Sequence, residues 1–278
     1  MNRKLKVGML QIRVVFSDAP GNLTRAREAV KKAVKEGAEI CVLPEAMDLG
    51  WANPEAAELA TPVPGPVSAL LCATALKNRV WLLSGITEKD GDDVYNTALL
   101  ISPQGEIKAK HRKINILTGV EDVYTPGDSL QTVKTPLGRI GFDICADNFM
   151  TSLPLGHALA RMGAQIILSP CAWAVTPDRD PKTDPYGAEW HEPYSLLSGL
   201  YHIPVIGVSN VGQVSGGTWK GWKAIGNSIA YDSDGTLKTV LPYGEDAECV
   251  RVIEVELKEP EHTGTSLSED VTRKTFPD

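Results

Sequence analysis

Three side chains with complementary chemistry each stand at the end of a short run that is typical of a strand. Glu45 follows the apolar run 40–43, Lys113 ends a short basic run, and Cys145 follows the apolar run 140–144. A thiol needs a base to become a thiolate, and the oxyanion that it creates on a carbonyl needs a positive partner. A carboxylate, an ammonium group and a thiol supply these roles, so the three residues together predict a cysteine hydrolase acting on carbon–nitrogen bonds.

Each of the three residues also has an ordinary structural interpretation. Free cysteine is among the most buried residue types, so Cys145 taken alone is typical of a core thiol. Glu45 alone fits a solvated loop acid, and Lys113 alone fits a surface lysine. Only Cys145 is followed by polar, carboxylate-bearing sequence, whereas the other cysteines lie in apolar contexts: Cys41, Cys72, Cys171 and Cys249. The combination in one chain favours catalysis.

The segments around these residues resemble the nitrilase, or carbon–nitrogen hydrolase, superfamily, in its amidase-like branch. The resemblance runs from Val7 to about Leu257. The matching segments are Leu43-Pro44-Glu45, Arg112-Lys113-Ile114-Asn115, 121–127, 141–145, Ser209-Asn210-Val211-Gly212 and Gly226-Asn227-Ser228. The resemblance implies Glu45 as the general base, Lys113 as the oxyanion stabiliser and Cys145 as the nucleophile that forms a thioester.

Two further groups follow from the resemblance. Glu121 matches a second family glutamate that precedes an aromatic-x-Pro-Gly turn, here 124–127, and it is expected to orient the lysine or the substrate amine. The register of this segment could also place Asp122 there. The backbone N–H of Ala146 is expected to help Lys113 stabilise the oxyanion.

The stretch after Cys145 departs from the common family pattern. Many amidases of the family carry an arginine where this chain has Asn148 and an acid where it has Thr151. A substrate carboxylate needs a bidentate cation, so the change argues against carboxylate-bearing substrates. True nitrilases usually place Trp-Glu after the cysteine, which Ala146-Asp147 does not match. We therefore predict an amidase for a small neutral amide, with a nitrilase, an acyltransferase or a non-catalytic scaffold as alternatives.

The acyl-binding walls are predicted to come from tryptophans. Trp51, Trp173 and Trp190 are the candidates, with Asn148 as a further substrate-binding residue. Tryptophans offer apolar surface to an acyl group, although plain packing is an equally common use for them. The segment 176–189 is rich in Pro, Asp and Gly and is expected to form a loop.

The pattern of strands and helices along the chain predicts an α/β scaffold that positions these residues. A strand at 4–12, a helix at 22–36 and a strand at 39–43 form a β-α-β unit, in which apolar residues recur at three- and four-residue steps along the helix. A helix at 66–77 and a strand at 80–86 repeat the pattern. Further strands are predicted at 97–102, 105–108, 130–135, 140–144, 165–169, 205–210, 228–232, 237–240 and 249–256, and further helices at 152–162 and 188–200. The family resemblance implies a four-layer α-β-β-α sandwich, which periodicity alone does not distinguish from a doubly wound single sheet.

Length and composition limit the remaining choices. We expect one domain over 1–258 and an arm over 259–278 for subunit contacts, in a homodimer or higher homo-oligomer by resemblance. The 278 residues are 42% hydrophobic and 23% charged, with net charge −7, and the one short basic run argues against nucleic-acid binding. No apolar run approaches the ~18 residues of a membrane span, so a cytoplasmic protein is expected. The cysteines form no Cys-x-x-Cys pair, and no metal or cofactor is expected.

Overall fold

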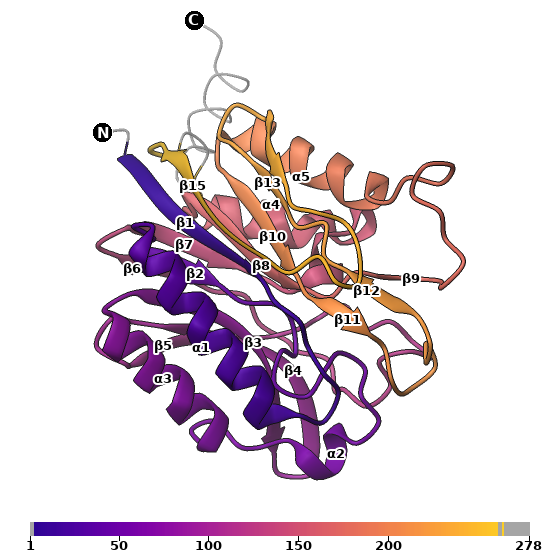
Figure 1. The fold of residues 1–278 in the computed structure, drawn as a ribbon. Helices are drawn as coiled ribbons and strands as arrows, with labels where there is room; N and C mark the ends of the chain where they lie inside the picture. The colour runs from indigo at the N-terminus through magenta and orange to yellow at the C-terminus, as the bar shows by residue number, and fades with distance from the viewer. Residues whose placement is uncertain (1–2, 261–262, 264–278) are drawn as a thin grey trace, which may run out of the picture.

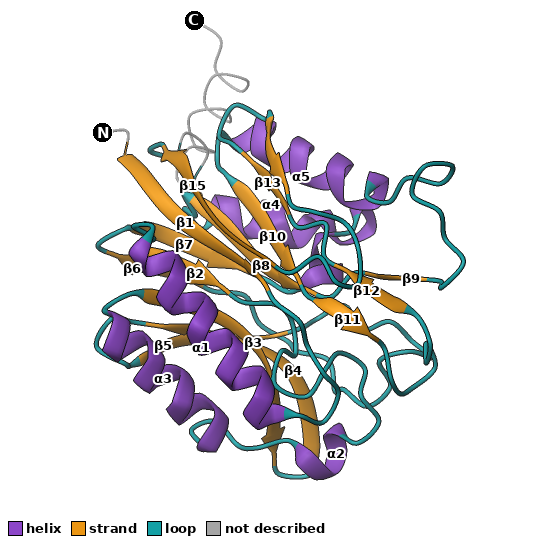
Figure 2. Ribbon diagram, in the orientation of Figure 1, coloured by secondary structure: helices purple, strands orange, loops and turns teal. Residues whose placement is uncertain are grey.

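The computed structural model describes residues 3–260 and 263, and its centre is a pair of six-stranded sheets packed face to face. Strands β1, β2 and β3 of the first sheet contact β10 and β8 of the second. Helices α1 and α3 cover the outer face of the first sheet, and α4 and α5 that of the second (Figures 1 and 2). The predicted four-layer α-β-β-α sandwich is confirmed. The predicted arm 259–278 lies outside the described residues except for 259, 260 and 263.

The first sheet has the strand order β15-β1-β2-β3-β4-β5, and β1, β2 and β3 are parallel to one another. Its strands are β1 (Arg3–Gln11), β2 (Ile40–Val42), β3 (Trp81–Asp90), β4 (Asp93–Ile101), β5 (Ile107–Arg112) and β15 (Cys249–Leu257). Its helices are α1 (Ala19–Lys35) and α3 (Pro66–Asn78), and the short α2 (Ala56–Leu59) lies near one end of β4. Glu45 and Lys113 follow β2 and β5 of this sheet.

The second sheet has the strand order β14-β13-β10-β8-β7-β6, with β7, β8 and β10 parallel. Its strands are β6 (Thr132–Thr135), β7 (Gly138–Phe142), β8 (Ile166–Cys171), β10 (Val205–Ser209), β13 (Ile229–Tyr231) and β14 (Leu237–Val240). Two 3-10 turns, η1 (Cys145–Asn148) and η2 (Met150–Ser152), lead from β7 into α4 (Leu153–Arg161), and α5 is Ala188–Tyr201. A third small sheet joins β9 (Ala174–Val175), β11 (Val211–Gln213) and β12 (Lys223–Ile225).

The strand alternation explains how the layers hold together. Leu5, Val7 and Met9 of β1 belong to a core cluster that includes β7 and β8 of the second sheet. Leu10 instead joins Val30 of α1 in a separate cluster on the outer side of the first sheet. Because successive side chains of a strand point to opposite faces, one strand supplies both apolar layers.

Most predicted elements are present, and the differences have local causes. Helix α1 begins three residues earlier than expected, because Pro20 lies in its first turn and the Asp18 carboxylate accepts a hydrogen bond from the Gly21 N–H (3.1 Å). Strand β4 begins four residues earlier than expected, and Asn96 is buried although it is polar. The two- and three-residue strands β9, β11 and β12 are too short to give a periodic signal.

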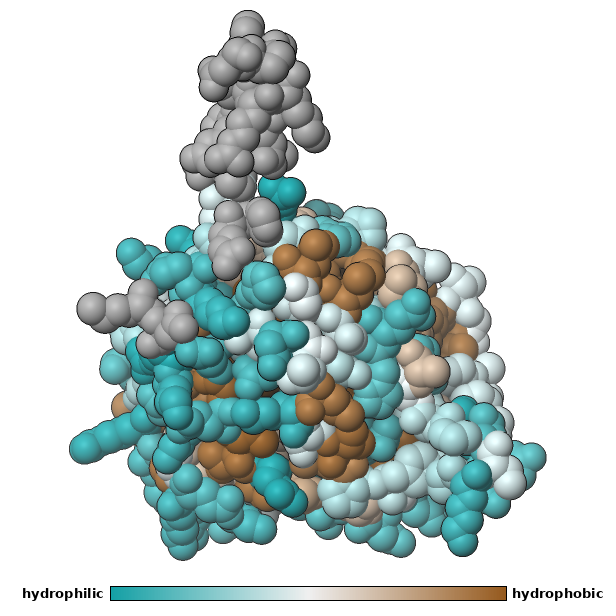
Figure 3. All heavy atoms as spheres, turned by 90° about the horizontal axis from the view of Figure 1, so that it is seen from above, coloured by the Kyte–Doolittle hydropathy of each residue, from teal (hydrophilic) through white to brown (hydrophobic). Residues whose placement is uncertain are grey.

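The surface mixes polar groups with small apolar patches. On the face in Figure 3, hydrophobic side chains form separate areas between hydrophilic ones. The large apolar residues that are exposed include two on α5 and two on β14: Leu196, Leu200, Leu237 and Val240. Among the described residues, none of the helices combines the length and the apolar character needed to cross a membrane.

Gly85 of β3 fixes the position of the loop that carries Glu45. A Cβ atom at Gly85 would lie 2.5 Å from Glu45 Cα and 2.6 Å from Pro44 O. The backbone of Gly85 is also hydrogen-bonded to this loop. Its N–H donates to Pro44 O and its carbonyl oxygen accepts from the Met47 N–H, both at 3.1 Å. The loop can therefore lie against β3 only where β3 has no side chain.

We predict that Gly85→Ala destabilises the protein by about 1–3 kcal/mol, the usual range for forced overpacking. The clash is with backbone atoms, which cannot rotate away as a side chain can. Denaturant unfolding measures the effect, with Gly199→Ala in α5 as the matched control, since a Cβ there meets nothing closer than 3.8 Å. A stable Gly85→Ala variant beside an equally stable Gly199→Ala variant would contradict this packing.

Candidate active site

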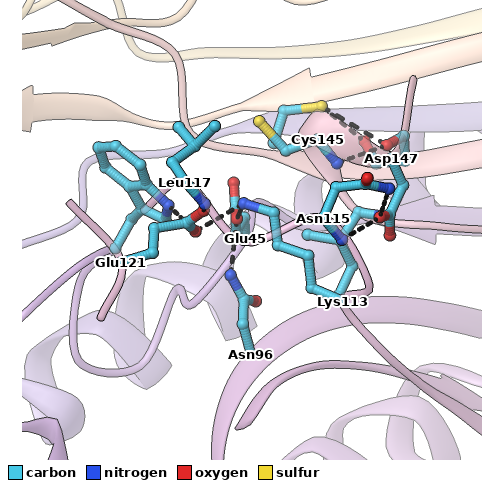
Figure 4. Close-up of polar contacts among 12 residues, drawn as sticks. Glu45, Asn96, Lys113, Asn115, Leu117, Glu121, Cys145 and Asp147 are labelled. Atoms are coloured by element: carbon cyan, nitrogen blue, oxygen red, sulfur yellow. Dashed lines mark hydrogen bonds and ion pairs between the residues drawn. The ribbon is translucent and has the colours of Figure 1, made fainter. Parts of the chain in front are cut away.

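Glu45 is fully buried in the loop after β2, and only one of its two carboxylate oxygens has a partner. Oε1 accepts hydrogen bonds from Lys113 Nζ (2.8 Å) and Asn96 Nδ2 (2.6 Å), whereas Oε2 has no partner in the described part of the chain (Figure 4). Burial raises the pKa of Glu45 to about 7, although the Lys113 charge opposes the rise. The unpartnered oxygen of a carboxyl group with such a pKa is suited to accept a proton near neutral pH.

Lys113 follows β5 and places its ammonium group between two carboxylates. Nζ lies 2.8 Å from Glu45 Oε1 and 2.6 Å from Glu121 Oε1, and all three side chains are fully buried. Burial alone would lower the pKa of Lys113, but the charges of Glu121 and Glu45 raise it well above its ordinary value. The lysine therefore stays protonated. An ammonium group has three N–H donors, so one remains after these two bonds.

Glu121 differs from Glu45 because both of its oxygens are occupied. Oε1 accepts from Lys113 Nζ and from Trp51 Nε1 (2.5 Å), and Oε2 accepts from the Leu117 N–H (2.8 Å). A carboxylate with both oxygens bound is suited to hold the lysine rather than to move protons. Asp122, the alternative register, instead accepts from the Gly119 N–H in an exposed position.

Cys145 lies at a sharp turn between β7 and η1. Its φ of 46° is positive, which is uncommon for a residue with a side chain and concentrates at functional sites. Its N–H donates to Ser169 Oγ at 3.0 Å, which fixes the turn against β8. Burial is the main cause that raises the pKa of the Cys145 thiol. A hydrogen bond with Cys171 and the charge of Glu45 raise it further. The resting group is therefore a thiol that needs a base.

Asp147 connects the turn that carries Cys145 to the segment that carries Lys113. Sequence analysis did not assign it a role, because its partners on the Lys113 side lie more than 30 positions away, although it also accepts from the nearby Ile144 N–H (3.2 Å). Its oxygens interact with His111 Nε2 (2.8 Å), the Ile114 N–H (3.2 Å), and the Asn115 N–H (2.9 Å) and Nδ2 (2.8 Å). The hydrogen bond and charge of Asp147 raise the pKa of His111 despite its burial. One side chain thus aligns the nucleophile with the lysine.

Asn148 was predicted to bind substrate, but the structure does not place it at the cavity. It is buried, and its Nδ2 donates to Asp143 Oδ1 (2.5 Å) and to Ser169 Oγ (3.0 Å). Burial raises the pKa of Asp143 to about 7, and the amide supplies this carboxyl group with a donor. Asn148 therefore supports the turn around Cys145 from inside the protein.

A cavity of about 420 Å³ opens beside Cys145 and Ala146. The three tryptophans predicted as its walls, Trp51, Trp173 and Trp190, do line it. Sequence analysis missed several other lining residues, which are Leu117, Phe149, Tyr186, Trp219 and Trp222. The site thus combines the Cys145 thiol, which lies at an aromatic cavity, with a buried carboxyl group that has an open oxygen and a held ammonium group.

The sequence matches the family model described as carbon–nitrogen hydrolase over residues 6–262. The chain belongs to the carbon–nitrogen hydrolase family. Curated relatives of this carbon–nitrogen hydrolase include the omega-amidase NIT2 of Mus musculus, 33% identical over 183 residues, 62% of this chain and 64% of that protein. Nitrilase 3 of Arabidopsis thaliana is 31% identical over 225 residues, 73% of this chain and 59% of that protein. The chain spans less than two thirds of the length of these relatives.

Solved structures share the fold of this carbon–nitrogen hydrolase over nearly its whole length. Nit3 of Saccharomyces cerevisiae, a member of the nitrilase superfamily, is 25% identical with a TM-score of 0.76, and the match covers 99% of this chain and 95% of that chain. An amidase from Nesterenkonia sp. has a TM-score of 0.74 at 18% identity, covering 98% and 96%. The similarity to the Nesterenkonia amidase is evidence for the fold alone.

We predict that alkylation of Cys145 by iodoacetamide accelerates as pH rises through about 7. Below that pH Glu45 is protonated and cannot take the thiol proton; above it the carboxylate can. The pH dependence of the alkylation rate, followed by peptide mass, measures this. Glu45→Gln should remove the inflection. Glu121→Gln should keep it but move it to lower pH, because the Glu121 charge helps to raise the pKa of Glu45. An unchanged inflection in Glu45→Gln would exclude Glu45 as the base.

Proposed function

We propose that the protein is an amidase that hydrolyses a small neutral amide through a thioester on Cys145. The observation that carries the proposal is the asymmetry between the two glutamates around Lys113. Glu121 has both oxygens bound, whereas Glu45 Oε2 has no partner among the described residues. One carboxylate is thus suited to hold the lysine, and the other to transfer protons beside the thiol.

In the first half of the proposed reaction, Glu45 Oε2 takes the proton of the Cys145 thiol as Sγ attacks the amide carbonyl. The third N–H of Lys113 and the backbone N–H of Ala146 stabilise the resulting oxyanion. Protonated Glu45 then gives its proton to the leaving nitrogen. The carbon–nitrogen bond breaks, ammonia or an amine departs, and the acyl group stays on sulfur as a thioester.

In the second half, Glu45 takes a proton from water, whose oxygen attacks the thioester carbonyl. The same donors stabilise the second oxyanion, the carbon–sulfur bond breaks, and the proton returns to the thiolate. The products are a carboxylic acid and the resting enzyme. Of the lysine and its two glutamates, only Glu45 gains and loses a proton in this scheme. That role fits the pKa of Glu45, which lies near neutrality.

Nitrile hydrolysis is the second candidate, favoured by the similarity to a nitrilase over 73% of the chain. The same thiol would add to the nitrile carbon and give a thioimidate, which water converts to acid and ammonia. The thiol, base and lysine would keep their roles. Only the substrate panel below separates the two reactions.

We further propose that the protein forms a homodimer through α5 and β14. These elements carry four exposed apolar residues, Leu196, Leu200, Leu237 and Val240. Contact between α5 and β13, the neighbour of β14 in the sheet, makes the two parts adjacent. Association of two copies would remove these apolar side chains from water. Burial of apolar surface is the usual driving force for such association.

The amidase proposal predicts ammonia release from neutral amides that depends on Cys145. Cys145→Ala should lower kcat/KM by about 10³-fold or more, because the covalent route is lost. Cys72→Ala, a half-buried thiol on α3, is the matched control and should retain full activity. The panel contains matched amides, ureas, N-carbamoyl acids and nitriles. Turnover of nitriles alone would move the protein to the nitrilase reaction, and equal activity in Cys145→Ala would refute the covalent mechanism.

A further inference from the structure

Five of the six tryptophans in the chain line the single cavity that contains Cys145. The sixth, Trp81, lies in the core between the sheets. The cavity tryptophans come from four separate segments, at 51, 173, 190 and 219–222. Such convergence is not required by packing of the sheets, and it concentrates flat apolar surface around the reacting thiol.

The aromatic residues form two groups, which we call the first and second aromatic walls. The first wall is a stack in which Trp190 lies between Phe149 and Trp173, with centroids 4.6 and 5.0 Å apart and planes within 22°. In the second wall Trp219 stacks on Trp222 at 4.0 Å and meets the edge of Trp51 at 5.1 Å. Trp173 and Trp190 are themselves buried, so the first wall presents mainly the half-buried Phe149 to the cavity, whereas the second wall presents the half-buried Trp219 and Trp222.

The second wall begins at the catalytic groups themselves. Trp51 Nε1 donates to Glu121 Oε1, and Lys113 Nζ lies 6.0 Å from the Trp51 ring. An acyl group whose carbonyl carbon is bound to Cys145 must therefore extend from the reaction centre along aromatic surface. The first wall also reaches this cavity, since Phe149 lies four residues after Cys145 and lines it.

The charges around the cavity disfavour an anionic substrate. Arg179 is the one basic side chain among the described residues that line the cavity, and it is already bound to the Asp184 carboxylate (3.0 Å) and to the Asp184 and Pro185 carbonyls. Its guanidinium also lies 5.2 Å from the Tyr186 ring. Two carboxylates, those of Asp184 and Glu189, line the cavity as well. A substrate carboxylate would meet repulsion and no uncompensated cation.

We propose that the acyl group of the substrate is a planar aromatic ring without a carboxylate, held between the two aromatic walls. The inference rests on the proposed function, because it names the substrate class of that same site. Stacked or edge-on ring contacts add affinity beyond burial of the same area, by about two- to tenfold per pair. A cyclohexyl group of similar size loses these contacts and keeps only the burial.

The test compares three amides that differ in one property each: phenylacetamide, cyclohexylacetamide and 4-carboxyphenylacetamide. We expect kcat/KM for the phenyl compound to exceed that for the cyclohexyl compound by about fivefold or more, and that for the carboxylate by about 100-fold or more. Equal values for the phenyl and cyclohexyl compounds, or efficient turnover of the carboxylate, would overturn the proposal.

Two tryptophan variants show whether the walls cause the preference. Trp219→Leu removes the ring that joins both neighbours in the second wall and should reduce the phenyl-over-cyclohexyl ratio to within about twofold. Trp219 is half-buried, so the change is tolerable for folding. Trp81→Phe in the core is the matched control and should leave the ratio unchanged. An unchanged ratio in Trp219→Leu would contradict the role of the second wall.

Binding to Cys145→Ala separates this inference from the proposed reaction. Quenching of tryptophan fluorescence gives Kd for the same three compounds without any turnover. The same order of affinities with no turnover by the wild type would support the aromatic site and refute the amidase proposal. Turnover by the wild type with no preference for the ring in either measurement would support the amidase and refute the aromatic site.

Discussion

The buried ion triad of Glu45, Lys113 and Glu121 is the interaction on which the rest of the site depends. Its side chains are withdrawn from water, and such charges are tolerated only when they are paired and hydrogen-bonded. The lysine therefore cannot move without leaving a carboxylate unpaired, and its remaining N–H is held in place. The surrounding contacts from Asn96, Trp51 and the Leu117 N–H complete the pairing.

The packing of the two sheets brings this triad and Cys145 into one site. Glu45 and Lys113 follow strands of the first sheet, whereas Cys145 follows β7 of the second. Cys145 and Glu45 come from different sheets, so their placement in one site depends on the face-to-face packing, and Asp147 reaches back to the segment after Lys113. Local turns complete the alignment: Gly85 admits the loop of Glu45, and the positive φ of Cys145 turns the thiol to the cavity.

Much of this arrangement could be predicted from the sequence, because its signals are local. The runs before Glu45 and Cys145 mark strand ends, and the long amphipathic segment marks helix α1. Asp147 was missed because the partners that link it to the Lys113 segment are distant in the chain, and Trp219 and Trp222 because they follow no periodic element. Asn148 was assigned to substrate because sequence position alone does not give the direction of a side chain in a 3-10 turn.

The central claim is that Cys145 carries the acyl group, and the most direct measurement is the mass of the enzyme quenched in acid during turnover of a neutral amide. The account predicts an added acyl mass on the peptide that contains Cys145, and its absence in Glu45→Gln. Cys171 is the alternative site of acylation that the measurement must distinguish, because it is a second buried thiol in hydrogen-bond contact with Cys145. Acylation at Cys171, or turnover with no acylated cysteine, would contradict the account.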